Sequence, residues 1–227
     1  MLWALPFVLV TVIAFPAIAV INARHSRNAS IESVTPTALY LQLLLIQAVL
    51  AGLAALAQRG ADVPIGWSAR VAPDTVVPAI GLLGVAVILA VWFREPAGSA
   101  PEISHLLAPK SGRDWALWTA AMVAAAVAEE FAYRGTLFAL ASRVIDRPFI
   151  SSLLTSAVFG LTHAAQGWRG VVMSGLFGLG LQSLVLWSGG LLLAILVHLT
   201  YDIGIQLAAR WLIPARPASR EPPARVA

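Results

Sequence analysis

Long apolar runs alternate with short polar connections along the whole chain. A transmembrane helix needs about 20 mostly apolar residues to cross about 30 Å of hydrocarbon. The pattern therefore predicts seven membrane-spanning helices, over residues 2–22, 37–58, 75–93, 115–141, 149–166, 170–187 and 190–213. The connections are too short to hold a soluble domain. We expect an all-α, polytopic membrane helical bundle.

The composition agrees with a membrane protein. The 227 residues are 59% hydrophobic and only 11% charged, whereas soluble domains carry about 25% charged residues. Most of the basic residues fall in short connections and in the C-terminal tail, so membrane topology explains them better than a nucleic-acid partner does. The chain has no cysteine, which excludes disulfides and thiolate ligands. Any metal must be held by histidine and carboxylate.

The distribution of Lys and Arg predicts an orientation. With seven spans and a cytosolic C-terminus, the cytosolic segments hold ten basic residues and the external segments hold four. The positive-inside rule then places the N-terminus outside and the C-terminus in the cytosol. The four external residues are Arg59, Arg70, Arg143 and Arg147.

The two ends of the chain differ in character. Residues 2–22 resemble a secretory signal at Ala17-Ile18-Ala19, but no basic residue precedes the apolar run, so we expect a retained transmembrane helix. Residues 214–227 are rich in Pro, Ala and Arg and have nothing to bury. We expect a disordered basic tail whose arginines meet anionic lipid heads.

Several ionisable side chains lie inside the apolar second half of the chain. Placing a charge at membrane depth costs roughly 2.5–3.5 kcal/mol on insertion scales, so such residues normally line a cavity, pair with one another and have a function. Together with Phe159, they form three clusters at one-turn spacing, each on its own predicted helix. The clusters are Glu129, Glu130 and Arg134; Phe159 and His163; and His198 and Asp202.

The first cluster predicts two different roles for adjacent glutamates. Glu130 and Arg134 are four residues apart and face each other along one helix side, which lowers the cost of burying both. Glu129 points about 100° away and is expected to lack that partner. We infer that Glu130 and Arg134 support the site, while Glu129 takes a proton or binds a metal. Two alternatives stay open: the carboxylates share the work, or the ion pair only holds helices together.

The histidines are ambiguous one at a time. His163 lies near a predicted helix end, where an interfacial or merely satisfied side chain is common. His198 has Asp202 one turn away, and a carboxylate there can fix the imidazole tautomer. Taken together, two histidines and an unpaired glutamate on three helices are a set that can activate water.

Other function classes fit less well. An aspartyl protease needs a second membrane aspartate beside Asp202, the zinc motif HExxH is absent, and Ser174 lies in no G-x-S-x-G element. A non-catalytic chaperone, bacteriocin-immunity protein or scaffold remains an alternative. A divalent-cation transporter ranks last, because inverted repeats and paired broken helices are missing.

The three motifs in this order resemble the CPBP family of intramembrane proteases, formerly called Abi. This family includes the eukaryotic CaaX-processing endoprotease and bacterial bacteriocin-processing and self-immunity proteins. Its EExxxR motif corresponds to Glu129, Glu130 and Arg134, its FxxxH motif to Phe159 and His163, and its third motif to His198 and Asp202. The resemblance covers Trp115 to Ile213, which implies motif-free membrane helices over 1–113, a catalytic core over 114–213 and the tail.

The resemblance implies an endopeptidase that cuts a membrane-associated peptide or protein, integral to the bilayer and expected in a bacterial cell membrane. Two mechanisms fit. In one, His163, His198 and Glu129 hold Zn²⁺. In the other, Glu129 acts as general base on a water oriented by His163, and His198 stabilises the oxyanion. An ionised Asp202 would repel an oxyanion, so we expect it to orient His198 instead. The site is expected to open to the cytosol.

Overall fold

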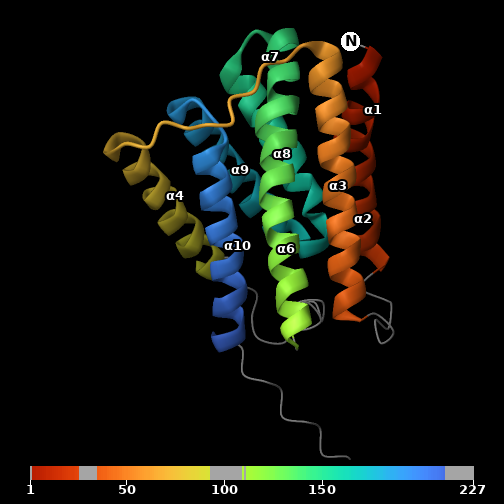
Figure 1. Ribbon diagram of the computed structural model, residues 1–227, viewed down its shortest axis with the longest axis vertical. Coiled ribbons are helices and arrows are strands. Elements are labelled where there is room, and N and C mark those ends of the chain that lie inside the picture. The colour runs from red at the N-terminus through yellow and green to blue at the C-terminus, as the bar shows by residue number, and fades with distance from the viewer. Residues whose placement is uncertain (1, 26–34, 93–108, 110, 213–227) are drawn as a thin grey trace, which may run out of the picture.

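The computed structural model describes residues 2–25, 35–92, 109 and 111–212 of the chain. All regular elements within these residues are helical, which confirms the predicted all-α bundle (Figure 1). The predicted tail, 214–227, lies outside the described residues. The elements are η1 (Leu2–Ala4), α1 (Leu5–Val8), η2 (Leu9–Ala14), α2 (Phe15–His25), α3 (Pro36–Ala61), α4 (Pro73–Trp92), α6 (Gly112–Glu129), η3 (Glu130–Leu137), α7 (Phe138–Ile145), α8 (Pro148–Thr162), η4 (Ala164–Gln166), α9 (Gly167–Ser188) and α10 (Leu192–Leu212).

Five of the helical stretches are long and apolar enough to cross a membrane: Leu2–Arg24, Pro36–Ala61, Pro73–Trp92, Gly112–Ile145 and Ala164–Ser188. Two shorter apolar helices, Pro148–Thr162 and Leu192–Ala208, complete the bundle. Large apolar side chains are exposed on the outward faces, such as Leu45 at 65% and Ile80 at 65%. In a soluble protein such surfaces would aggregate, whereas in a bilayer they face acyl chains. The chain is an integral membrane protein.

One span differs from its prediction. The fifth was expected over 149–166, but α8 ends at Thr162 and is only 15 residues long, which is about 22 Å. His163 follows at the helix end, then the short turn η4, and Gly167 has a φ of +80° that favours glycine. The helix therefore ends four residues earlier than predicted, with His163 at its C-cap.

The connection between α3 and α4, residues 62–72, crosses one end of the bundle and contacts the turn between α9 and α10 (Figure 1). Two backbone hydrogen bonds join them, from Arg70 N to Ser188 O at 2.8 Å and from Leu191 N to Gly66 O at 3.0 Å. On its inner side, Trp67 stacks on Phe131 with ring centroids 4.9 Å apart. The connection therefore packs against η3, the element that holds the charged site residues.

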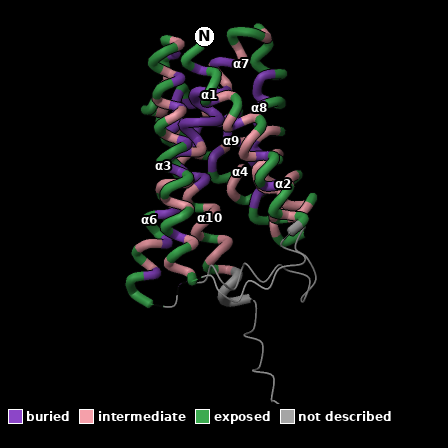
Figure 2. Tube along the Cα trace, turned by 90° about the vertical axis from the view of Figure 1, so that its right-hand side faces the viewer, coloured by how far each residue is buried: buried purple, intermediate pink, exposed green. Residues whose placement is uncertain are grey.

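The interior of the bundle is built by close helix packing. Figure 2 shows the buried positions gathered between the helices and the exposed positions on their outward faces. The tightest approach joins α8 to α9, where a Cβ added to Gly160 would lie 2.5 Å from the carbonyl oxygen of Val171. Glycine lets two backbones meet closely, which is how membrane helices gain packing energy without a hydrophobic driving force. This contact fixes α8 and α9 relative to each other below the site.

Candidate active site

The first cluster lies where the long helix changes its winding. Residues Gly112–Ile145 form one continuous helix, but Glu130–Leu137 adopt a π-helical turn, and every residue of that turn is buried. Such wider turns are rare within helices and often occur at functional sites. Here the turn brings Glu130 and Arg134 together: Arg134 Nη1 lies 3.2 Å from Glu130 Oε1. The predicted pairing of these residues is present.

Glu130 has a second partner that the sequence did not reveal. The same Oε1 atom lies 2.8 Å from Nδ1 of His198, a residue 68 positions further along the chain on α10. Glu130 is fully buried, and Arg134 and His198 are nearly so. Because a carboxylate accepts hydrogen bonds, Nδ1 of His198 carries the proton. Glu130 therefore joins η3 to α10 and fixes the tautomer and orientation of the imidazole.

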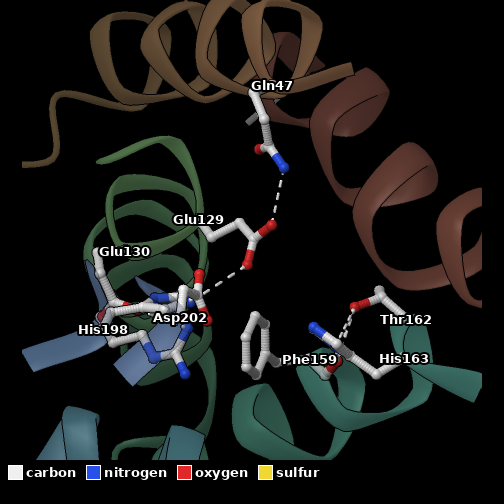
Figure 3. A network of polar contacts seen from close by, with 9 residues as sticks. Gln47, Glu129, Glu130, Phe159, Thr162, His163, His198 and Asp202 are labelled. Atoms are coloured by element: carbon white, nitrogen blue, oxygen red, sulfur yellow. Dashed lines mark hydrogen bonds and ion pairs between the residues drawn. The ribbon is translucent and has the colours of Figure 1, made fainter. Parts of the chain in front are cut away.

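Glu129 points to a different side of the helix from Glu130. From the sequence it had no assigned partner, but the structure shows one. Gln47 of α3 donates a hydrogen bond from Nε2 to Glu129 Oε1 at 2.8 Å. The other oxygen, Oε2, lies 3.9 Å from His198 Nε2 (Figure 3). The Glu129 side chain is 16% exposed, whereas that of Glu130 is inaccessible. Of the two glutamates, Glu129 is thus the one a water molecule or a substrate can reach.

Gln47 is the site residue that sequence reasoning missed. It belongs to no recognised motif, and the family resemblance carried no function over to the first three spans. The available signal was its position: it is the glutamine within the apolar run Leu43–Leu50. A polar side chain at membrane depth faces the bundle interior unless it has another partner. Gln47 is only 6% exposed.

Asp202 approaches His198 at the ring nitrogen that Glu130 does not contact. It was predicted to orient His198, but the hydrogen bond to Nδ1 comes from Glu130. Asp202 Oδ2 lies 3.5 Å from His198 Nε2, on the same side as Glu129, and its side chain is 26% exposed. His198 is therefore within 4 Å of three carboxylates. Asp202 therefore lies beside Nε2, the nitrogen of His198 that Glu130 does not contact.

Phe159 connects the clusters through its ring. Its centroid lies 4.7 Å from that of His163 and 6.2 Å from that of His198. The Arg134 guanidinium carbon stands 4.1 Å from the ring centroid, a cation–π contact. Space for this arrangement exists because residue 178 on α9 is glycine: a Cβ there would lie 2.7 Å from Arg134 Nη2. Phe159 is almost fully buried, and its ring packs against Arg134 and both histidines.

His163 lies across the Phe159 ring from His198 and Asp202 (Figure 3). Its Nδ1 is 3.0 Å from the carbonyl oxygen of Phe159 and 3.2 Å from Thr162 Oγ1. Nδ1 therefore carries a proton that it donates to its own helix end. In both histidines, Nδ1 is engaged by an acceptor and Nε2 faces away from it. The structure brings Glu129 to His198 directly, and His163 to them through Phe159.

The spacing of these side chains bears on whether they could hold a metal ion. Within the described residues, no group of three or more His, Asp or Glu side chains converges closely enough to hold a metal ion. The orientation of each histidine by a hydrogen bond at Nδ1 is typical of ligands and of catalytic imidazoles alike. The three-ligand zinc set of Glu129, His163 and His198 is not assembled in this geometry.

The fold and the site together define an integral membrane protein with a buried centre of carboxylates and histidines. Comparison with known families identifies the kind. Residues 111–204 match the family model described as Rce1-like, type II CAAX prenyl endopeptidase Rce1-like. This segment of the chain is similar to that family, and the resemblance drawn from the three motifs is confirmed. The match includes all seven motif residues but not Gln47.

No curated protein and no solved structure matches the chain. The family is one of membrane proteases.

Proposed function

We propose that the chain is an intramembrane endopeptidase that hydrolyses a peptide bond of a membrane-associated protein or peptide, with water activated by Glu129. One observation carries the proposal. Glu129 is held on one oxygen by Gln47, while its other oxygen faces His198 Nε2 at 3.9 Å in a partly open space. That separation is too long for a direct hydrogen bond and is one that a water molecule bridges.

In the proposed reaction, Glu129 Oε2 is the general base. It removes a proton from the bridging water as the water oxygen attacks the carbonyl carbon of the scissile peptide bond. The C–O bond forms and the carbonyl oxygen takes the negative charge. The proton then passes from Glu129 to the leaving amine as the C–N bond breaks. Atoms and charge balance without a covalent enzyme intermediate.

His198 is proposed to stabilise the oxyanion. As an imidazolium it donates from Nδ1 to Glu130 and from Nε2 toward the developing charge. Its orientation is preset, because Glu130 is in turn held by Arg134 in the buried ion pair. Asp202 lies 3.5 Å from the same nitrogen and is assigned the role expected from the sequence, which is to orient the imidazole.

His163 is proposed to act from the other side of Phe159. Its Nδ1 hydrogen bond to the carbonyl oxygen of Phe159 leaves Nε2 to orient the water or the substrate carbonyl. Phe159 then sets the spacing of the two imidazoles. A zinc-dependent route remains the second prediction from the sequence, and no step above passes through a metal. The orientation expected from the basic residues, with a cytosolic C-terminus, is retained in the proposal.

The experiment that tests the proposal compares membranes from cells that carry the wild-type chain or Glu129→Ala. Equal amounts of the two proteins in the membrane are verified first. Mass spectrometry of new N-termini should then detect cleaved membrane proteins with the wild-type chain alone. New termini that persist at full abundance with Glu129→Ala would contradict the proposed role. Flux of divalent cations into proteoliposomes, abolished by the same substitution, would favour a transporter.

A further inference from the structure

Gln47 lies outside the segment that matches the protease family, yet it touches the proposed base. Gln47 precedes Glu129 by 82 positions in the sequence, and the two meet because α3 packs against α6 (Figure 1). Its Nε2 donates to Glu129 Oε1 at 2.8 Å. Its own Oε1 is buried and accepts no hydrogen bond from the described residues. The amide therefore places one donor and one unused acceptor at the edge of the site.

A second hydrogen bond joins the same two helices, and it provides a comparison. Thr37, about three turns before Gln47 on α3, donates from Oγ1 to Asp114 Oδ1 at 3.0 Å. Asp114 is part of the capping box at the start of α6. This bond holds α3 to α6 but lies far from Glu129 along the helix. The two helices are thus already joined by a polar contact elsewhere, so the bond to Glu129 is not required for their association.

The bond from Gln47 distinguishes the two oxygens of Glu129. The amide N–H of Gln47 donates to Oε1, so this oxygen already has a partner. The other oxygen, Oε2, is left to face His198 Nε2. A glutamate side chain has three rotatable bonds, so without Gln47 the carboxylate would rotate away from this orientation. The bond removes that freedom before a substrate arrives.

We propose that Gln47 is a positioning residue for the hydrolysis: it binds Glu129 Oε1 and so commits Oε2 to act as the general base. This inference rests on the proposed function. It assigns a catalytic task to α3, one of the helices that lie outside the family match. The rate of the chemical step should depend on Gln47, while substrate affinity should not.

The test uses the purified full-length chain in liposomes with a membrane peptide that the wild-type protein cleaves. Gln47→Met keeps the length of the side chain and removes both polar atoms. Loss of a hydrogen bond to a charged group corresponds to about a 10–100-fold decrease in rate. We expect kcat to fall by that factor, KM to change less than about twofold, and the thermal midpoint to match that of Thr37→Val.

Thr37→Val is the matched control, because it deletes a hydrogen bond between α3 and α6 that lies away from Glu129. Its kcat should equal that of the wild-type protein. Gln47→Asn is the second variant if Gln47→Met folds poorly, since its amide stops one methylene short of Glu129 and should also lower kcat. A wild-type kcat in both Gln47 variants, or an equal loss of kcat in Thr37→Val, would overturn the positioning role.

The same measurements distinguish a failure of the proposed function from a failure of the inference on Gln47. If Glu129→Ala cleaves the peptide at the wild-type rate, the assignment of Glu129 as the base is wrong, and so is the positioning role of Gln47. If Glu129→Ala abolishes cleavage and the Gln47 variants cleave at the wild-type rate, only the inference on Gln47 is wrong.

Discussion

His198 turns its Nδ1 to Glu130 at 2.8 Å, across 68 residues of sequence and between two helices. The neighbouring Glu129 stands at the other nitrogen of the same ring, 3.9 Å away. One imidazole therefore separates two adjacent carboxylates into different tasks. Glu130, buried with Arg134, contacts and orients the ring, and Glu129, which is partly exposed, is the proposed base.

Glu130→Gln is expected to destabilise the protein as well as inactivate it. The substitution leaves Arg134 buried without its counter-ion and weakens the hydrogen bond that orients His198. Breaking a buried ion pair on one side costs about 3–5 kcal/mol. Thermal unfolding in detergent measures the effect. The exposed pair Arg70–Asp74 is the control: Asp74→Asn should cost no more than about 1 kcal/mol. Equal effects of the two substitutions would contradict the structural role of Glu130.

Phe159→Leu is expected to lower activity by about tenfold, since aromatic and cation–π contacts are worth about 0.5–2 kcal/mol each. The smaller side chain removes the ring that contacts Arg134, His163 and His198. Cleavage by purified protein in liposomes measures the loss. Phe149→Leu is the control, because Phe149 is 72% exposed on the same helix. A Phe159 variant with the activity of the Phe149 variant would show that the ring contacts have no catalytic consequence.

Gly178→Ala tests whether the position of Arg134 depends on α9. The added Cβ would lie 2.7 Å from Arg134 Nη2 and 3.1 Å from Phe159 Cδ1, so one of these groups must shift. We expect lower activity and a cost of about 1–3 kcal/mol from overpacking. Gly52→Ala is the matched control, since nothing lies within 4 Å of a Cβ at that position. Unchanged activity and stability in both variants would argue against a role for this close contact.

Chelation tests the zinc prediction. In the metal-free mechanism, activity survives EDTA and dialysis, because the water is activated by Glu129 alone. In the zinc mechanism, the purified protein carries about one metal ion per chain and loses both the metal and its activity on chelation. Metal content of the wild-type protein and of His163→Ala is measured in parallel. Activity that requires a metal bound through His163 would replace the mechanism proposed above.

The helices were predictable because the hydrocarbon core of a bilayer requires long apolar segments. A span must be apolar for about 20 residues, and the seven predicted ranges overlap the observed helices. The end of α8 was not predictable in this way. Leu161 to Ala165 continue the apolar run apart from Thr162 and His163, and the helix stops through backbone geometry at η4 and Gly167. Hydropathy does not report backbone conformation.

The site was predictable where its contacts are local. Glu130 and Arg134 are four residues apart, so their pairing follows from helical periodicity. The contacts of His198 with Glu130 and of Gln47 with Glu129 join different helices. They depend on how each helix is rotated and on the π-helical turn at Glu130–Leu137, which a regular 3.6-residue period does not describe. Sequence spacing therefore identified the charged groups but not which of them meet.

The central claim is that Glu129 activates the water that cleaves the peptide bond. Single-turnover cleavage of a membrane peptide by purified protein in liposomes tests it most directly, with Glu129→Gln compared to the wild-type chain. General-base catalysis contributes about 10²–10⁴ in rate. We predict a decrease of that size in Glu129→Gln, with unchanged thermal stability and unchanged peptide binding. A rate within a few fold of the wild-type value would contradict the account.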